Sequence, residues 1–323
     1  MLFDTHAHPY ITFKKSPEAI LENFFRDPNN RLVSIACDIK TSIQSIELAE
    51  AYPWVYATIW YHPCDLPYAS LNSGSAPAIA RVLLQGEIKL QNAVASFPLQ
   101  GKEFKIEVSW DTHNTSLNSL LQGEIKLQIQ ELKNIYQKHK KHIVAVWETG
   151  LDYYHLASIS EKSWLWESVI KQIQAEYFRA QIRLAQELEL PFVIHSRESN
   201  DDVLAILSQE QASNYVFHCF SWDIDFAHKV LEQNPQAMFW LGWPLTFRKS
   251  HALHELARKL PLKHILIETD APFLTPEPLR GREENEPLYV SHILAKLQEL
   301  RDESPDEIEK MVYENGKKFY AVD

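Results

Sequence analysis

Histidine and carboxylate side chains follow short apolar segments at six places in this chain. They are His6 with His8, His62, Glu148, His195, His218 and Asp270. Imidazole with carboxylate suits borderline divalent cations such as Zn²⁺ or Mn²⁺, whereas Mg²⁺ prefers oxygen ligands and keeps waters. Buried charged groups are paired or bind metal, because an isolated charge away from water is costly. If these segments end at one place, their side chains predict a metal site.

Taken singly, each residue also has a structural explanation. A histidine after a strand is commonly a hydrogen-bonded structural residue, and the chain holds 14 histidines. Glu148 can cap the segment that follows it, and Asp270 can hydrogen-bond a turn. His6 and His8 are more specific, because side chains two apart on a strand project on the same side. The combination of all these groups favours metal binding.

The number of ligands predicts more than one ion. Six ligands exceed one tetrahedral site, and a catalytic site keeps one position open. We therefore expect two divalent ions, Zn²⁺, Mn²⁺ or Mg²⁺, about 3.5–4 Å apart. The assignment gives one ion His6, His8 and Asp270, the other His195 and His218, and makes Glu148 the bridge. Such a pair lowers the pKa of a bound water, whose proton Asp270 can accept. This chemistry is metal-assisted hydrolysis.

Short apolar or β-branched segments that alternate with helical patterns must position these groups. The eight predicted strands are Leu2–Thr5, Leu32–Cys37, Trp54–Trp60, His142–Trp147, Pro191–Ile194, Tyr215–Phe217, Ala237–Leu241 and His264–Glu268. The predicted helices include Pro17–Arg26, Ser42–Ala51, Glu161–Leu190, Asp201–Gln209, Asp223–Gln233 and Lys249–Leu260. This alternation predicts an α/β fold, a (β/α)₈ TIM barrel whose active site lies at the carboxyl ends of the strands. An open doubly wound sheet is the alternative.

The alternation is interrupted between about residues 65 and 141. A single helix would connect the third strand to the fourth, yet this stretch is far longer. Within it the segment Leu83–Gln91, L-L-Q-G-E-I-K-L-Q, recurs identically at Leu120–Gln128. Two copies are too few for a solenoid. We expect one barrel domain over residues 1–323 with an expanded surface insertion; an element that binds a partner is the alternative.

The composition excludes several classes of function. The formal net charge is −11, which argues against a broad basic surface for long nucleic acids. A small site for one phosphodiester remains compatible when bound metals supply positive charge. Three cysteines without a C-x-x-C motif fit a reducing compartment. Because no signal peptide or apolar span of membrane length is seen, we expect a cytoplasmic protein without membrane association.

Six short motifs closely resemble those of the TatD family of metal-dependent deoxyribonucleases. They occur in the family's order as D-T-H-A-H at Asp4–His8, E-T-G-L-D at Glu148–Asp152, P-F-V-I-H-S-R at Pro191–Arg197, H-C-F-S at His218–Ser221, E-T-D-A-P at Glu268–Pro272 and N-E-P at Asn285–Pro287. The resemblance spans essentially the whole chain. It implies an amidohydrolase-like barrel with a binuclear site, in which His6, His8 and Asp270 match the first metal, Glu148 the bridge, and His195 with His218 the second metal.

The resemblance also implies contacts to substrate. His62 matches the family's His-Pro after the third strand and would contact a phosphate, and Arg197 and Arg282 are further candidates. The chain departs from the family near Arg282, where R-E-E-N-E-P replaces the commoner R-N-E-P. Trp222 stands where the family usually has glycine, and Trp243 lies in a segment that is less rich in glycine. These two tryptophans either stack on nucleobases or pack in the space that glycine leaves.

Three functions are compatible with these residues. The leading prediction is a phosphodiesterase that acts on DNA, in particular a 3′–5′ exonuclease on single-stranded DNA, with Asp270, Glu148 and His62 as catalytic groups. The second is a carboxylic-ester or amide hydrolase that uses the same site, such as an aminoacyl-tRNA deacylase. The third is a catalytically inactive barrel kept as a binding module, which the intact ligand set disfavours.

Overall fold

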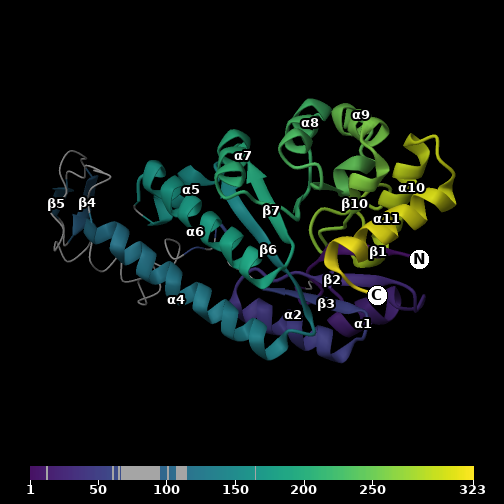
Figure 1. The fold of residues 1–323 in the computed structure, drawn as a ribbon, viewed down its shortest axis with the longest axis horizontal. Coiled ribbons are helices and arrows are strands. Elements are labelled where there is room, and N and C mark those ends of the chain that lie inside the picture. The colour runs from purple at the N-terminus through teal and green to yellow at the C-terminus, as the bar shows by residue number, and fades with distance from the viewer. Residues whose placement is uncertain are drawn as a thin grey trace.

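Eight parallel strands form a nearly closed barrel in the computed structural model of this chain (Figure 1). The structure describes residues 1–11, 14–59, 62–64, 66, 95–99, 102–106, 115–163 and 165–323. The strand order is β1-β2-β3-β6-β7-β8-β9-β10, and a parallel bridge from Ala7 to Ala271 connects the first and last strands of that order. Each strand pairs with its neighbour along the chain, which confirms the predicted α/β TIM barrel.

Each observed strand overlaps its predicted segment, but several ends differ: β1 and β7 run past the predicted ends at Thr5 and Ile194, and β2 stops short of the predicted Cys37. They are β1 Phe3–Ala7, β2 Arg31–Ser34, β3 Val55–Ile59, β6 Ile143–Asp152, β7 Phe192–Arg197, β8 Tyr215–Phe217, β9 Met238–Leu241 and β10 Ile265–Ile267. The strand β6 continues to Asp152, past the predicted end at Trp147. Its last residues pair with β7, from Thr149 to Asp152. This extension places Glu148 within the strand instead of after it.

Helices surround the barrel, and four of them, α1, α2, α8 and α11, begin at a residue whose side chain caps the helix. The helices are α1 Pro17–Phe24, α2 Ile39–Ala51, α4 Thr115–His139, α5 Leu156–Ser163, α6 Glu167–Leu188, α7 Asn200–Gln209, α8 Ile224–Gln233, α9 His251–Lys259, α10 Val290–Leu300 and α11 Pro305–Tyr320. Ser304 forms a capping box at the start of α11, and Asp38 forms one at the start of α2. The single helix predicted over Glu161–Leu190 is two helices, α5 and α6. No described helix has both the length and the apolar character needed to cross a membrane.

The end of the long segment between β3 and β6 is the helix α4. In Figure 1, α4 extends beyond the barrel towards the antiparallel hairpin of β4 (Ala95–Leu99) and β5 (Lys102–Ile106). Leu132 and Tyr136 of α4 belong to the main core, so this part of α4 is the barrel's own helix between two neighbouring strands. The second copy of the repeat lies in α4, whereas the first copy, Leu83–Gln91, lies outside the described residues.

Two layers of apolar side chains fill the fold. Alternate strand residues such as Phe192 and Ile194 pack against the helices, while Val193 belongs to a separate cluster. That inner cluster has a member from each of seven strands together with Tyr313, Phe319 and Tyr320 of α11. A Cβ atom on Gly316 of α11 would lie 2.6 Å from the ring of Phe3, so only glycine allows this close approach. The helix α11 therefore closes the inner layer at the amino end of β1.

Candidate metal centre

All six predicted metal ligands lie at the carboxyl ends of the barrel strands. His6 is in β1 with His8 directly after it, Glu148 is in β6, His195 is in β7, and His218 and Asp270 follow β8 and β10. Beneath them the rings of Trp147 and Trp240 stack with centroids 4.6 Å apart. The His6 ring meets Trp147 edge-on at 4.7 Å. These buried indoles form an apolar floor, so the polar groups above them have no water on that side.

His6, His8 and Asp270 form the first ligand group. Nε2 of His6 and Nε2 of His8 are 3.0 Å apart. Oδ1 of Asp270 lies 3.2 Å from Nε2 of His6 and 3.6 Å from Nε2 of His8. The period of two predicted this pairing of His6 with His8. One ligand atom from each residue therefore points at a common centre, as a single cation requires.

The outer nitrogens show that this group fits a cation. Nδ1 of His6 donates to Oε2 of Glu268 at 2.8 Å, and Nδ1 of His8 donates to the carbonyl oxygen of Ile35 at 3.0 Å. With the ring proton held on Nδ1, each neutral imidazole presents the lone pair of Nε2 to the other. Two lone pairs that face each other at 3.0 Å repel unless a cation or an added proton lies between them. The donor set thus suits a divalent metal ion.

Glu148, His195 and His218 form the second ligand group. Oε1 of Glu148 lies 3.2 Å from Nδ1 of His195 and 3.4 Å from Nε2 of His218. The opposite nitrogens donate outward, from His195 to Oδ2 of Asp152 at 3.0 Å and from His218 to Oε2 of Glu268 at 3.0 Å. Each ring again keeps its inner nitrogen available for a cation, and a carboxylate behind it fixes the tautomer.

Unusual backbone geometry aims these groups. Glu148 and Asp270 have φ of 44° and 56°, and Cys219 beside His218 has φ of 42°, the left-handed region that side chains rarely adopt. The pairing of β6 with β7 shifts register around Glu148, and such a bulge turns a side chain towards a site. A Cβ atom on Gly150 would lie 1.9 Å from the carbonyl oxygen of His195. Glycine at this position therefore allows β6 and β7 to bring Glu148 beside His195.

The charges of the site balance only with added positive charge. Burial opposes ionisation of Glu148 and Asp270, but the neighbouring histidines hold the pKa of both carboxyl groups below their usual range. Burial likewise favours the neutral ring of His218, but the charges of Glu268 and Glu148 raise its pKa to about 9. Without a cation, protons on the rings supply the positive charge. A divalent cation can replace them.

Sequence reasoning missed two carboxylates that orient the ligands. Glu268, fully buried, accepts hydrogen bonds from His6 of the first group and His218 of the second. Asp152 accepts one from His195. No strand pattern marked them, because Glu268 and Asp270 follow the end of β10 at Ile267 and Asp152 lies beyond a bulge in β6.

His62 lies beside the second ligand group. One ring nitrogen of His62 lies within 4.8 Å of a ligand atom of Glu148 and of a ligand atom of His195. The ring centroids of His62 and His195 are 5.2 Å apart. The backbone N–H of Cys64 donates to Nδ1 of His62 at 3.0 Å, which leaves the ring proton on Nε2. Burial lowers the pKa of His62 to about 4, so the ring is neutral and Nε2–H is a hydrogen-bond donor.

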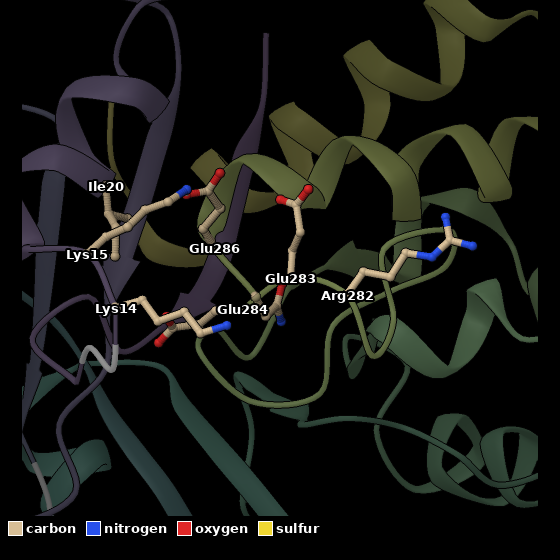
Figure 2. Close-up of a pocket in the computed structure, with 8 residues that line it drawn as sticks. Lys14, Lys15, Ile20, Arg282, Glu283, Glu284 and Glu286 are labelled. Atoms are coloured by element: carbon tan, nitrogen blue, oxygen red, sulfur yellow. The ribbon is translucent and has the colours of Figure 1, made fainter.

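The two predicted arginines occupy different positions. The guanidinium of Arg197, at the end of β7, lies 3.8 Å above the centre of the exposed Tyr154 ring. Arg282 belongs to a pocket of about 150 Å³ that Lys14, Lys15 and three glutamates also line (Figure 2). In Figure 2 its guanidinium points away from Lys15 and Glu286, which form an ion pair at 2.8 Å. Arg282 is in neither ligand group.

The two tryptophans near the rim make packing contacts. The ring of Trp222 meets Phe220 at 5.0 Å and Phe226 at 5.5 Å, within a cluster of aromatic rings on β8 and α8. The ring of Trp243 lies 5.1 Å from that of Phe247. Both tryptophans are partly buried, whereas Tyr154 and Phe273 on the same face are 55% and 42% exposed. The exposed aromatic surface at the mouth thus comes from residues that sequence reasoning did not select.

Comparisons with known proteins agree with this geometry. The family model described as TatD related DNase matches residues 3–321. The chain belongs to the TatD family of metal-dependent hydrolases. It is 30% identical, over the full length of both chains, to an uncharacterized metal-dependent hydrolase of Bacillus subtilis named YabD. It is 32% identical to the uncharacterized metal-dependent hydrolase YcfH of Escherichia coli K12, over 81% of this chain and 94% of that protein.

Solved structures of TatD proteins share the fold. A crystal structure of the TatD homologue YjjV from Escherichia coli K12 superposes with a TM-score of 0.67 at 22% identity, covering 100% of this chain and 98% of that one. A hydrolase of the TatD family from Entamoeba histolytica superposes with the same TM-score of 0.67 at 17% identity, covering 99% and 97%. These superpositions agree with the predicted barrel fold, while the family model and the full-length match to YabD confirm the predicted family.

Proposed function

We propose that this TatD-family hydrolase cleaves DNA phosphodiester bonds, starting from an exposed 3′ end of single-stranded DNA, with two divalent cations. The observation that carries the proposal is the pair of ligand groups whose inner atoms converge at the barrel mouth, on Oδ1 of Asp270 and on Oε1 of Glu148. The description of the matching family as TatD related DNase supports the choice of substrate. The net charge of −11 favours action at strand ends over tracking along a duplex.

In this proposal each ligand group holds one cation and Glu148 is shared between them. His6, His8 and Asp270 hold the first ion, and His195 with His218 holds the second. Zn²⁺, Mn²⁺ and Mg²⁺ are the candidate ions, and the nitrogen-rich ligand set favours the first two. When bound, the ions would supply Lewis-acid activation of water and stabilise negative charge that develops on the phosphate.

The protein's own groups position the substrate and move the proton. The carboxylate of Asp270, ionised at neutral pH because its pKa lies below the usual range, accepts the proton of the attacking water. The neutral ring of His62 donates its Nε2–H to a phosphate oxygen. Arg197, held over the ring of Tyr154, adds a positive charge to the rim.

Exposed aromatic rings at the mouth are suited to unpaired bases. Phe273 follows Asp270 closely and its ring lies 5.6 Å from that of His8, beside the first ligand group. Tyr154 follows β6, beside the second group. Stacking on a nucleobase contributes about 1–3 kcal/mol and requires a single strand, because duplex bases already stack on each other. In this proposal Arg282 contacts a phosphate farther along the strand.

The test is a nuclease assay on end-labelled single-stranded DNA with Mg²⁺, Mn²⁺ or Zn²⁺ added in turn. We expect metal-dependent cleavage with a product ladder that shortens from the 3′ end, and loss of this activity in Glu148→Ala. If no metal supports cleavage although the protein binds divalent ions, the DNase proposal is wrong. Carboxylic esters and amides, including aminoacyl-tRNA, are then the substrates to assay.

A further inference from the structure

A third set of donor atoms lies behind His195. Sγ of Cys64 is 3.9 Å from Nδ1 of His155, which is 2.8 Å from Oδ2 of Asp152. The three donor atoms all lie within 4.8 Å of one another. They come from three parts of the chain, because Cys64 follows β3, Asp152 ends β6 and His155 directly precedes α5. None of the three is among the ligands of the metal centre described above.

The spacing of these atoms suits a metal ion. Zinc binds thiolate at about 2.3 Å, imidazole nitrogen at about 2.0–2.1 Å and carboxylate oxygen at about 2.0–2.2 Å. Neighbouring ligands in a tetrahedral site are therefore about 3.3–3.8 Å apart. The observed contacts of 2.8 Å and 3.9 Å lie close to this range, so an ion needs only small side-chain movements.

The surroundings give the site a fixed base and an open side. The side chain of Asp152 is 1% exposed, and the backbone N–H of His155 donates to its Oδ1 at 2.9 Å. The side chain of His155 is 41% exposed, and Cys64 is a partly exposed thiol. An ion can therefore enter from solvent past His155 and Cys64 and meet a carboxylate that is already held in place.

We propose that Cys64, Asp152 and His155 form an auxiliary binding site for a thiophilic divalent cation such as Zn²⁺. A thiolate ligand favours Zn²⁺ over Mg²⁺ or Mn²⁺, so this site discriminates against Mg²⁺ and Mn²⁺ more strongly than the oxygen- and nitrogen-lined centre does. Three protein ligands leave one position for water or another small ligand. Oδ2 of Asp152 also accepts the Nε2–H of His195, so the auxiliary site and the metal centre share a contact.

The experiment is a titration of the reduced, full-length chain with Co²⁺, followed by absorption. Cobalt bound to a thiolate gives a charge-transfer band in the near ultraviolet, which ligation by histidine and carboxylate alone does not give. We expect this band in the wild type, its loss in Cys64→Ser and a strong reduction in His155→Gln. The matched controls Cys37→Ser and His251→Gln keep the band.

Two spectroscopic results would overturn the auxiliary site. One is a wild-type titration without the charge-transfer band, and a visible cobalt spectrum in the same titration would show that the metal centre itself still binds. The other is a band that persists in Cys64→Ser. Zinc content after dialysis gives a second measure, with one ion fewer per chain expected in Cys64→Ser than in the wild type. Equal zinc contents contradict the proposal, and circular dichroism checks that each variant folds.

Discussion

The histidines of the two ligand groups differ in how deeply they are buried. In the first group, the side chains of His6 and His8 are 0% and 4% exposed. In the second group, the side chains of His195 and His218 are 15% and 10% exposed, and the polar ring of His62 lies alongside. The first group therefore reaches the barrel mouth only through Asp270, which is 18% exposed, whereas both histidines of the second group face the mouth.

The outer carboxylates make the same distinction. Glu268 holds one histidine of each group, so both groups depend on it. Asp152 holds only His195 and also contacts His155 outside the centre. Carboxylates behind ligating histidines fix ring orientation and basicity, so their effects should follow this pattern of contacts. The two groups therefore share the support of Glu268, whereas a change at Asp152 should affect the second group alone.

The largest expected effect comes from removing the carboxylate that joins the groups. Glu148→Ala should lower the rate of hydrolysis by about 10³-fold or more, because it removes the carboxylate that both ligand groups share. The measurement is kcat/KM on single-stranded DNA, with the exposed Glu232→Ala on α8 as the matched control. Activity near the wild-type level in Glu148→Ala would show that neither group depends on this residue.

Without metal, the free energy of unfolding should fall at alkaline pH because of His218 in the second group. The pKa of His218 is raised from its ordinary 6.5 to about 9 by nearby carboxylates, despite burial. Its contribution to folding is therefore complete below pH 6.5 and is lost as the pH rises through about 9. For metal-free protein we expect the free energy of unfolding to fall by up to about 3 kcal/mol between these limits.

Urea unfolding with a chelator at neutral and alkaline pH measures this loss. The variant His218→Gln should show a smaller loss than the wild type, and so should metal-loaded protein, in which the ion replaces the ring proton. An equal pH dependence in the wild type and in His218→Gln would mean that this ring does not carry the proton.

Substitution of Glu268 or Asp152 should lower metal affinity by a smaller factor and should distinguish the two ligand groups. Glu268→Gln should weaken both steps of a calorimetric Mn²⁺ titration by about 10–100-fold, because Glu268 supports a histidine in each group. Asp152→Asn should weaken one step by a similar factor and leave the other near its wild-type value. If both variants weaken the two steps alike, the groups are not separately supported and the comparison fails.

The smallest expected effect concerns the aromatic rim on the side of the second group. Tyr154→Ala should weaken binding of single-stranded DNA by about 5–10-fold, the lower part of the range for stacking on one base. Hydrolysis of a small phosphodiester should change less, because it has no base to stack. The control Trp222→Phe should keep DNA affinity near the wild type, since Trp222 packs against Phe220 and Phe226. The opposite ranking would assign stacking to Trp222.

The barrel and most of its ligand set could be predicted, because both depend on local patterns. Short apolar runs mark strands, and a histidine or carboxylate at the end of each run must meet the others once the strands are parallel. Asp152 was missed because β6 continues through a bulge that the sequence does not announce. Glu268 was read as part of a motif only, because its contacts with His6 and His218 join residues far apart in the sequence.

The remaining features depend on contacts between distant parts of the chain. The contact of Cys64 with His155 joins residues 91 positions apart, which no local pattern predicts. The choice between stacking and packing stayed open for Trp222 because the sequence does not show the rings of Phe220 and Phe226 packed against it. The boundary of the segment after β3 was also hidden, since α4 belongs partly to the barrel and partly beyond it.

The most direct test of the two-group centre is anomalous diffraction from crystals grown with Mn²⁺, which the auxiliary site disfavours. The account predicts two peaks about 3.5–4 Å apart, one at Nε2 of His6 and His8 and one between His195 and His218, with Glu148 in contact with both. A single peak, or two peaks without Glu148 between them, would contradict it.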